Sequence, residues 1–361
     1  MEYSSSLLSI LKDINKKAGS DVIHFGVERH QHPKIPFSSV RANYMTYGGV
    51  PMYRVIEFAG PEGSGKTTTA IDICAQYQNM PDAKGILYID HEHTFDEFWA
   101  TTLGLDCTKI LLYQPETESA EDIFDYAKKL IMTDDIGLCV VDSLASLVPK
   151  QIIEEDLDKQ ERGGIAKVLT RVCNTLVPIL KRYKTTLIGI NQVRDNFDSW
   201  VNSYNTPGGK AWKHQCSLRI MFQKGKFIDE NGNELGVNPE NPSGNIVKMN
   251  IMKIKGARPD RKLGHYSLNY TDGIDTVSDT VEVALEMGLL YKKGGWFYFY
   301  DLDTGELVED KKIQGLANLK QYYHDNYDEF NALWNKINDE IIKGDSYSNN
   351  GQVDEEGNTE E

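Results

Sequence analysis

Short apolar runs alternate with amphipathic stretches along most of the chain. Six runs rich in β-branched and aromatic residues predict strands at 55–59, 85–90, 110–113, 137–142, 186–191 and 218–222. Helical periodicity separates several of them, most clearly at 67–78 and 120–132. Apolar strands that alternate with helices are typical of a parallel sheet covered on both faces. The pattern therefore predicts an α/β protein with a mostly parallel central sheet.

The pattern changes toward both ends of the chain. Strands are expected at 249–255 and 266–270, and helices at 280–287 and 317–343 flank the β-rich GGWFYFYD, which predicts a small α+β domain. An amphipathic helix near 7–17 and an extended stretch predict an N-terminal oligomerisation segment. The final stretch, GDSYSNNGQVDEEGNTEE, has six acids and no Lys or Arg, which predicts a disordered tail. The expected division is 1–40, 41–271, 272–343 and 344–361.

Composition narrows the possible functions. No apolar run reaches the roughly 18–20 residues that a membrane span needs, and the first residues lack a secretory cleavage site, so a cytoplasmic protein without a membrane partner is expected. The five cysteines form no CxxC pair, which is the motif expected of a zinc site or a thiol-exchange site. The 39 basic and 54 acidic residues give a net charge of -15, so contact with DNA must be local.

The strongest local motif is GPEGSGKTT, which has the P-loop spacing GxxxxGK[ST] between a predicted strand and a predicted helix. Its glycines let backbone N–H groups and the helix N-terminus face phosphate oxygens. We expect Lys66 to reach the β- and γ-phosphates of ATP and the Thr67 hydroxyl to ligate Mg²⁺. The phosphate-binding residues are expected to be Gly60, Pro61, Glu62, Gly63, Ser64, Gly65, Lys66, Thr67 and Thr68.

Polar residues at the ends of other predicted strands complete a candidate hydrolytic site. Asp142 ends an apolar strand, as expected of an acid that holds Mg²⁺ through water. A carboxylate of Asp90 or Glu92 could polarise the attacking water. The amides of Asn191 and Gln192 could sense the γ-phosphate. Each residue alone could also be an ordinary polar strand end; their occurrence together with the P-loop favours an ATPase.

With these motifs in place, the sequence resembles the bacterial RecA family of homologous-recombination ATPases. The resemblance extends through GGVPMYRVIEFAGPEGSGKTT, YIDHEHTFD, VVDSLASLVPK, INQVR, TPGGKAWK and YTDGID, and less closely through the N-terminal helix and the C-terminal domain. It implies that Glu92 is the catalytic glutamate and that Gln192 couples the γ-phosphate to a DNA-binding loop. It also implies that Asp96 and Trp99 flank the adenine.

The resemblance further implies that one subunit completes the site of its neighbour. Lys253 and Lys255, in NIMKIKGARP, are similar to two lysines that reach across a filament interface to the neighbour's ATP, once a one-residue insertion is allowed. Such cations stabilise charge on the transferred phosphoryl group as arginine fingers do. A solvated strand face is the alternative interpretation of these lysines.

The same resemblance implies DNA contact in two loops, near 154–164 and 194–209. The first is more acidic than a phosphate-binding strand would be, while the second carries aromatic residues that can stack on bases unless they pack against the core. The residues expected to contact DNA are Arg162, Lys167, Arg194, Phe197, Trp200, Tyr204, Gly208, Gly209 and Lys210.

The resulting expectation is a recombinase that uses ATP and Mg²⁺ to form helical filaments on single-stranded DNA and exchanges strands with homologous duplex. Single-strand-binding and loader proteins are further candidate partners. Two alternatives stay open at this point. A hexameric DNA helicase of the same fold would also hydrolyse ATP on DNA, and a regulatory paralogue would load a recombinase without exchanging strands itself.

Overall fold

The computed structural model describes residues 3–18, 23, 33–154, 164–193 and 206–347. The chain divides into two units, Met1–Pro33 and Lys34–Glu361. The first contains α1 (Ser5–Ala18), whose apolar side chains Leu7, Ile10 and Ile14 are exposed. The second unit includes residues 34–40, which the expected division assigns to the N-terminal segment, and it begins with β1 (Lys34–Ile35), which pairs with β2 (Val50–Pro51).

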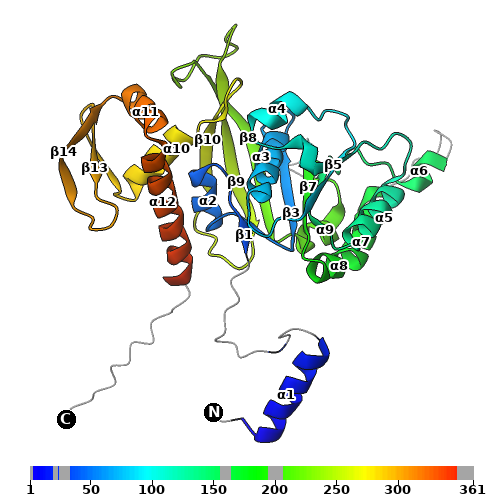
Figure 1. The fold of residues 1–361 in the computed structure, drawn as a ribbon. Coiled ribbons are helices and arrows are strands. Elements are labelled where there is room, and N and C mark those ends of the chain that lie inside the picture. The colour runs from blue at the N-terminus through cyan, green and yellow to red at the C-terminus, as the bar shows by residue number, and fades with distance from the viewer. Residues whose placement is uncertain (1–2, 19–22, 24–32, 155–163, 194–205, 348–361) are drawn as a thin grey trace, which may run out of the picture. The chain divides into compact units, whose positions relative to one another are not determined.

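A nine-stranded sheet forms the centre of the second unit, in the order β11-β10-β9-β8-β3-β7-β6-β4-β5 (Figure 1). The strands from β8 to β5 in this order are parallel, and β9, β10 and β11 are antiparallel additions, which confirms the mostly parallel α/β sheet. Their bounds are β3 (Val55–Gly60), β4 (Gly85–Asp90), β5 (Ile110–Tyr113), β6 (Ile136–Asp142), β7 (Thr186–Gln192), β8 (Leu218–Ile228), β9 (Gly244–Ile254), β10 (Leu263–Asn269) and β11 (Gly273–Ile274).

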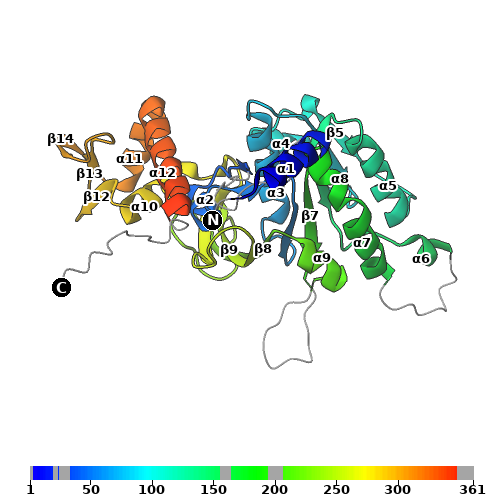
Figure 2. The same ribbon diagram turned by 90° about the horizontal axis from the view of Figure 1, so that it is seen from below.

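Helices cover the parallel strands on both faces, and two apolar clusters lie between them (Figures 1 and 2). One face packs against α3 (Lys66–Gln78) and α4 (Glu97–Thr102), with the short 3-10 helix η1 (Cys107–Lys109) beside α4. The other face packs against α5 (Ala120–Ile131), α7 (Gly164–Thr175), α8 (Val177–Arg182) and α9 (Gly209–Gln215), while α6 (Lys150–Glu154) has no buried residue. The expected helices at 67–78 and 120–132 are α3 and α5.

The C-terminal elements form a third apolar cluster. They are α10 (Thr276–Glu286), the sheet β12 (Leu290–Lys293), β13 (Trp296–Tyr300) and β14 (Leu307–Gln314), α11 (Leu316–Asp325) and α12 (Tyr327–Tyr347). Helix α2 (Val40–Thr46) contacts both α10 and β10, so it links this region to the central sheet. Arg41 of α2 forms two hydrogen bonds, of 2.6 and 2.7 Å, with the Glu286 carboxylate.

Several element bounds differ from the expected ones. The helix expected at 317–343 is two helices, because Asn326 leaves helical geometry, and α12 continues past residue 343 to Tyr347. Residues 348–361 of the expected tail lie outside the described residues. Strand β8 continues beyond the expected end at residue 222 to Ile228, and β9 begins at Gly244 rather than at residue 249. Across the described ranges, no helix combines the length and apolarity needed to cross a membrane.

Candidate nucleotide-binding site

The P-loop connects β3 to α3, and its glycines are required by the backbone. A Cβ on Gly60 would lie 2.4 Å from the carbonyl oxygen of Phe222, so only glycine fits where the loop passes β8. Gly63 and Gly65 have φ of +64° and +94°, a left-handed conformation that glycine adopts without steric cost. The loop therefore turns so that the N-terminus of α3 faces the space in front of the loop, where an anion can bind its free N–H groups.

A cavity of about 350 Å³ lies in front of this loop. Its lining residues are Gly63, Ser64, Gly65, Lys66, Thr67, Thr68, Trp99, Lys224, Asn245, Leu268 and Tyr270. The wall from the P-loop and α4 was expected. The sequence does not predict the opposite wall, which comes from β8, β9 and β10, although Tyr270 begins the quoted motif YTDGID. The Tyr270 hydroxyl donates a hydrogen bond of 2.8 Å to Asn245 Oδ1 in this wall. Nothing in the local sequence marks Lys224 as a wall residue.

The ammonium group of Lys66 is hydrogen-bonded to the backbone of the P-loop. Its Nζ donates to the Pro61 carbonyl oxygen at 2.6 Å, and the Ser64 hydroxyl donates to the same oxygen at 2.7 Å. Burial lowers the pKa of Lys66, while the negative charges of Asp142 and Glu92 act in the opposite direction. A buried cation at the N-terminus of α3 can bind a phosphate group strongly, because little water competes there.

Thr67 and Asp142 meet beneath the loop. The Thr67 hydroxyl donates to Asp142 Oδ2 at 2.8 Å, and the Tyr88 hydroxyl donates to the same oxygen at 3.1 Å. Burial raises the pKa of Asp142 to about 6, although these two hydrogen bonds act to lower it. A hydroxyl and a carboxylate are the hard oxygen ligands that Mg²⁺ prefers, directly or through water. The two residues therefore fit the magnesium site expected from the sequence.

Glu92, rather than Asp90, faces the amide expected to sense nucleotide. Gln192 Nε2 donates to Glu92 Oε1 at 3.0 Å, and the Ser143 hydroxyl donates to the same oxygen. The Asp90 carboxylate instead accepts hydrogen bonds from the Thr94 and Phe95 N–H groups and from a glutamine side chain. Asp90 thus stabilises the turn after β4, and Glu92 is the carboxylate available for acid–base chemistry.

Asp96 and Trp99 lie at the N-terminal end of α4, and of the two only Trp99 is among the residues that line the cavity. Asp96 is the N-cap of this helix, and its Oδ1 accepts a hydrogen bond of 3.0 Å from the Trp99 N–H. The Trp99 indole lines the cavity, and its Nε1 is 3.4 Å from the Thr68 hydroxyl oxygen. Both residues expected at the adenine therefore lie at the start of the helix that borders the P-loop. The hydrogen bond from the Trp99 N–H to Asp96 fixes the backbone position of Trp99.

Lys253 and Lys255 lie away from the P-loop of their own chain. Lys253 pairs with Arg219 in the sheet, and the Lys255 N–H donates to the Ser217 carbonyl oxygen, level with the start of β3 rather than its end. The Lys253 Nζ donates to the carbonyl oxygens of Lys213 and His214, at 2.7 and 2.8 Å, at the end of α9. The Lys255 Nζ donates to the His214 oxygen at 2.9 Å. Both lysines thus contact the helix that follows the second expected DNA loop.

Parts of the two expected DNA-binding loops are described. Lys167 on α7 and Lys210 on α9 are exposed, and these helices pack together. Gly208 is buried, and a Cβ there would lie 2.8 Å from Leu169 Cδ1; a Cβ on Gly209 would lie 3.0 Å from Ala166 Cβ. The two glycines therefore allow close contact between the helices after the two loops. Arg162, Arg194, Phe197, Trp200 and Tyr204 lie outside the described residues.

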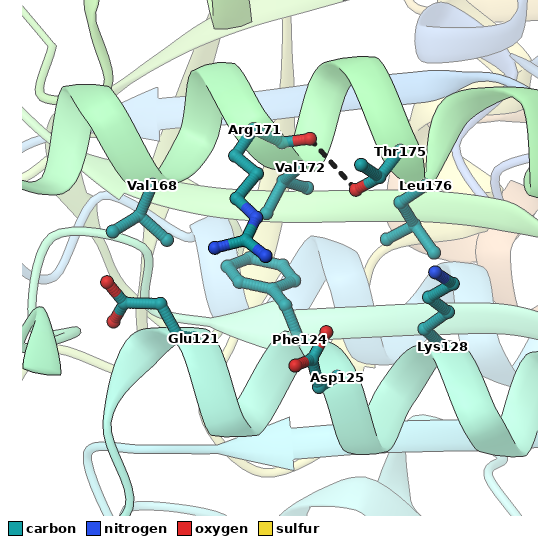
Figure 3. A pocket seen from close by; sticks show the side chains of 9 residues that line it. All are labelled: Glu121, Phe124, Asp125, Lys128, Val168, Arg171, Val172, Thr175 and Leu176. Carbon is teal, nitrogen blue, oxygen red and sulfur yellow. Dashed lines mark hydrogen bonds between the residues drawn. The ribbon is translucent and has the colours of Figure 1, made fainter.

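A second, smaller cavity of about 40 Å³ lies between α5 and α7 (Figure 3). Apolar side chains of Phe124, Val168, Val172 and Leu176 line it, and charged side chains of both helices border it. The Thr175 hydroxyl donates to a backbone carbonyl of its own helix at 2.9 Å. This cavity lies on the sheet face opposite the P-loop helix α3 and is too small to hold a nucleotide.

The fold and the first cavity define a P-loop α/β protein with a nucleotide-binding site at the carboxyl ends of its parallel strands. Residues 5–275 match the model of the RecA N-terminal domain. The chain belongs to the RecA family.

Curated relatives match most of the chain. The protein named Protein RecA of Ruminococcus albus is 33% identical over 291 residues, which cover 80% of this chain and 68% of that protein. Protein RecA of Mesoplasma florum is 31% identical over 345 residues, which cover 94% of this chain and 97% of the relative. Protein RecA of Bacteroides thetaiotaomicron is 32% identical over 317 residues, which cover 86% of this chain and 92% of the relative. The resemblance stated from the motifs is therefore confirmed.

Proposed function

We propose that this chain is a DNA-dependent ATPase that forms helical filaments on single-stranded DNA and exchanges strands with homologous duplex. The observation that carries the proposal is the grouping of Lys66, the Thr67–Asp142 pair and the Glu92–Gln192 pair around one P-loop in a member of the RecA family. The hexameric helicase and the regulatory paralogue are less favoured, because the relatives reported above are all named Protein RecA.

Different residues of this chain bind the phosphates, hold the metal ion and activate the attacking water. The P-loop N–H groups and Lys66 bind the β- and γ-phosphates, and Trp99 provides a wall for the adenine. Thr67 and Asp142 would hold Mg²⁺, which neutralises charge on the phosphate oxygens when bound. Glu92 orients the attacking water and accepts its proton. Gln192, hydrogen-bonded to Glu92, is placed to connect this step with the DNA-binding segment that begins two residues later.

Neighbouring subunits are expected to complete the site. The position of Lys253 and Lys255, level with the start of β3, favours a role at another subunit's phosphates over a role at their own. Helix α1 has an exposed apolar face, which supports self-association through the N-terminal segment. Lys167 and Lys210 supply exposed cations near the two expected DNA loops, where they can bind phosphates without reading sequence.

Two measurements on the purified protein test the proposal. ATP hydrolysis is measured with and without single-stranded DNA, and strand exchange is measured between a circular single strand and a homologous linear duplex. We expect DNA-stimulated hydrolysis and ATP-dependent exchange by the protein alone. Hydrolysis with duplex unwinding but no exchange would favour the helicase, and exchange that requires a second recombinase would favour the regulatory paralogue.

A further inference from the structure

A buried ion pair lies at the centre of the sheet, outside the nucleotide cavity. Glu57 of β3 is fully buried, and its carboxylate accepts a hydrogen bond from Arg219 Nε of β8, whose side chain is 12% exposed. Removing two charges from water is costly, and replacing such a pair with apolar residues of similar volume is often neutral or stabilising. Stability alone therefore does not account for an ion pair at this position.

The remaining hydrogen bonds of the pair reach two other segments. Asn191 Nδ2, at the end of β7, donates to Glu57 Oε1 at 2.9 Å and to the Pro207 carbonyl oxygen at 2.9 Å. Arg219 Nη2 is 3.3 Å from the hydroxyl oxygen of Thr206, which is itself buried. One carboxylate and one guanidinium thus connect β3, the end of β7 and residues 206–207.

These connections hold both sides of a single segment of the chain. Asn191 precedes the second expected DNA loop, and Thr206 and Pro207 lie near the C-terminal end of that loop, shortly before α9. Gln192, the neighbour of Asn191, donates to Glu92 at 3.0 Å. A displacement at residues 206–207 must therefore break or carry along hydrogen bonds that also fix the strand end bearing Gln192.

We propose that Glu57 and Arg219 are positioning residues for the DNA response of the ATPase. They hold the two sides of the DNA-binding segment in a fixed relation to Gln192 and Glu92, so that DNA bound by the segment changes the rate of hydrolysis. Neither residue lines the nucleotide cavity of its own chain, so neither contacts the ATP bound there. This proposal rests on the proposed function and adds to it the residues through which DNA is coupled to hydrolysis.

The test is the double variant Glu57→Leu/Arg219→Met, which removes both charges and keeps most of the side-chain volume. Arg41→Met/Glu286→Leu is the matched control, because it removes another ion pair that joins distant segments but does not touch the DNA-binding segment. We expect the test variant to bind ATP and hydrolyse it without DNA at a rate within about twofold of the wild type. The DNA concentration for half-maximal stimulation should rise about tenfold, a usual size for coupling between two sites. The control variant should keep the wild-type DNA response.

An unchanged DNA response of the double variant would overturn the proposal. Equal losses of the basal and the DNA-stimulated rates would also overturn it, since a purely structural pair predicts that result. If the variant does not fold, Thr206→Val decides the question by removing only the hydroxyl near Arg219. We then expect a shift of about threefold in the DNA dependence, at the lower end for coupled sites, and no shift would overturn the proposal. A wild-type protein whose hydrolysis ignores DNA would instead contradict the proposed function.

Discussion

The Trp99 indole offers a direct test of where the adenine lies. Trp99 is half-buried in the wall of a cavity of about 350 Å³, and its indole Nε1 makes a long contact there, at 3.4 Å to the Thr68 hydroxyl oxygen. Its contribution to ATP binding should therefore come from the ring face. Stacked aromatic groups contribute about 0.5–1.5 kcal/mol beyond burial, and with the apolar area lost in Trp99→Ala we expect a total of about 1–2 kcal/mol. This corresponds to a rise of about fivefold to 30-fold in the dissociation constant of ATP.

Isothermal titration of ATP into the wild type, Trp99→Ala and Trp99→Phe measures this effect. Trp99→Phe keeps a ring and should raise the dissociation constant only about twofold to threefold. Circular dichroism and thermal unfolding control for loss of packing, because the indole also contacts the core beside α3. The same titration with inorganic triphosphate should show no difference between the proteins. Wild-type affinity for ATP in Trp99→Ala would refute the placement of the adenine on this wall.

Three further variants test other parts of the site and the fold. Lys66→Ala should abolish ATP-dependent filament formation, imaged by electron microscopy, because it removes the buried cation at the P-loop; normal turnover would refute the site. Lys253→Ala/Lys255→Ala should leave ATP binding by isolated subunits intact and remove DNA-stimulated hydrolysis, and filaments mixed with wild type should show whether the defect lies in the adjacent subunit. Burial raises the pKa of Asp279 to about 7 from an ordinary value of 3.8, so the folded state binds this proton more tightly and stability is lost as the pH rises toward 7. The free energy of unfolding, measured in urea, should therefore decrease between pH 5 and pH 8 by about 2–3 kcal/mol less in Asp279→Asn than in the wild type. An equal decrease in both proteins would refute the raised pKa of Asp279.

The parts of the fold and site that the sequence predicts are those encoded by local spacing. The P-loop, the strand that ends at Asp142 and the helix that starts at Lys66 each follow from residues that are close in the chain. The central strands are predicted well because strands buried on both faces are almost wholly apolar.

The remainder depends on contacts between distant segments. Position at a strand end leaves Asp90 and Glu92 as alternatives, and only the family resemblance indicates Glu92. The structure separates their roles through the turn hydrogen bonds of Asp90 and the hydrogen bond from Gln192 to Glu92. The far wall of the cavity comes from β8, β9 and β10 and from Tyr270 just after β10, and of these residues only Tyr270 lies in one of the quoted motifs. The break at Asn326 was missed because the helical pattern continues on both sides of it.

The central claim is that nucleotide at the boundary between subunits joins them into a filament around single-stranded DNA. Analytical ultracentrifugation of the purified protein with a slowly hydrolysed ATP analogue and a long single strand tests it most directly. The account predicts large, DNA-length-dependent complexes that form with the analogue and disassemble with ADP. A protein that sediments as a monomer with both ligands present would contradict it.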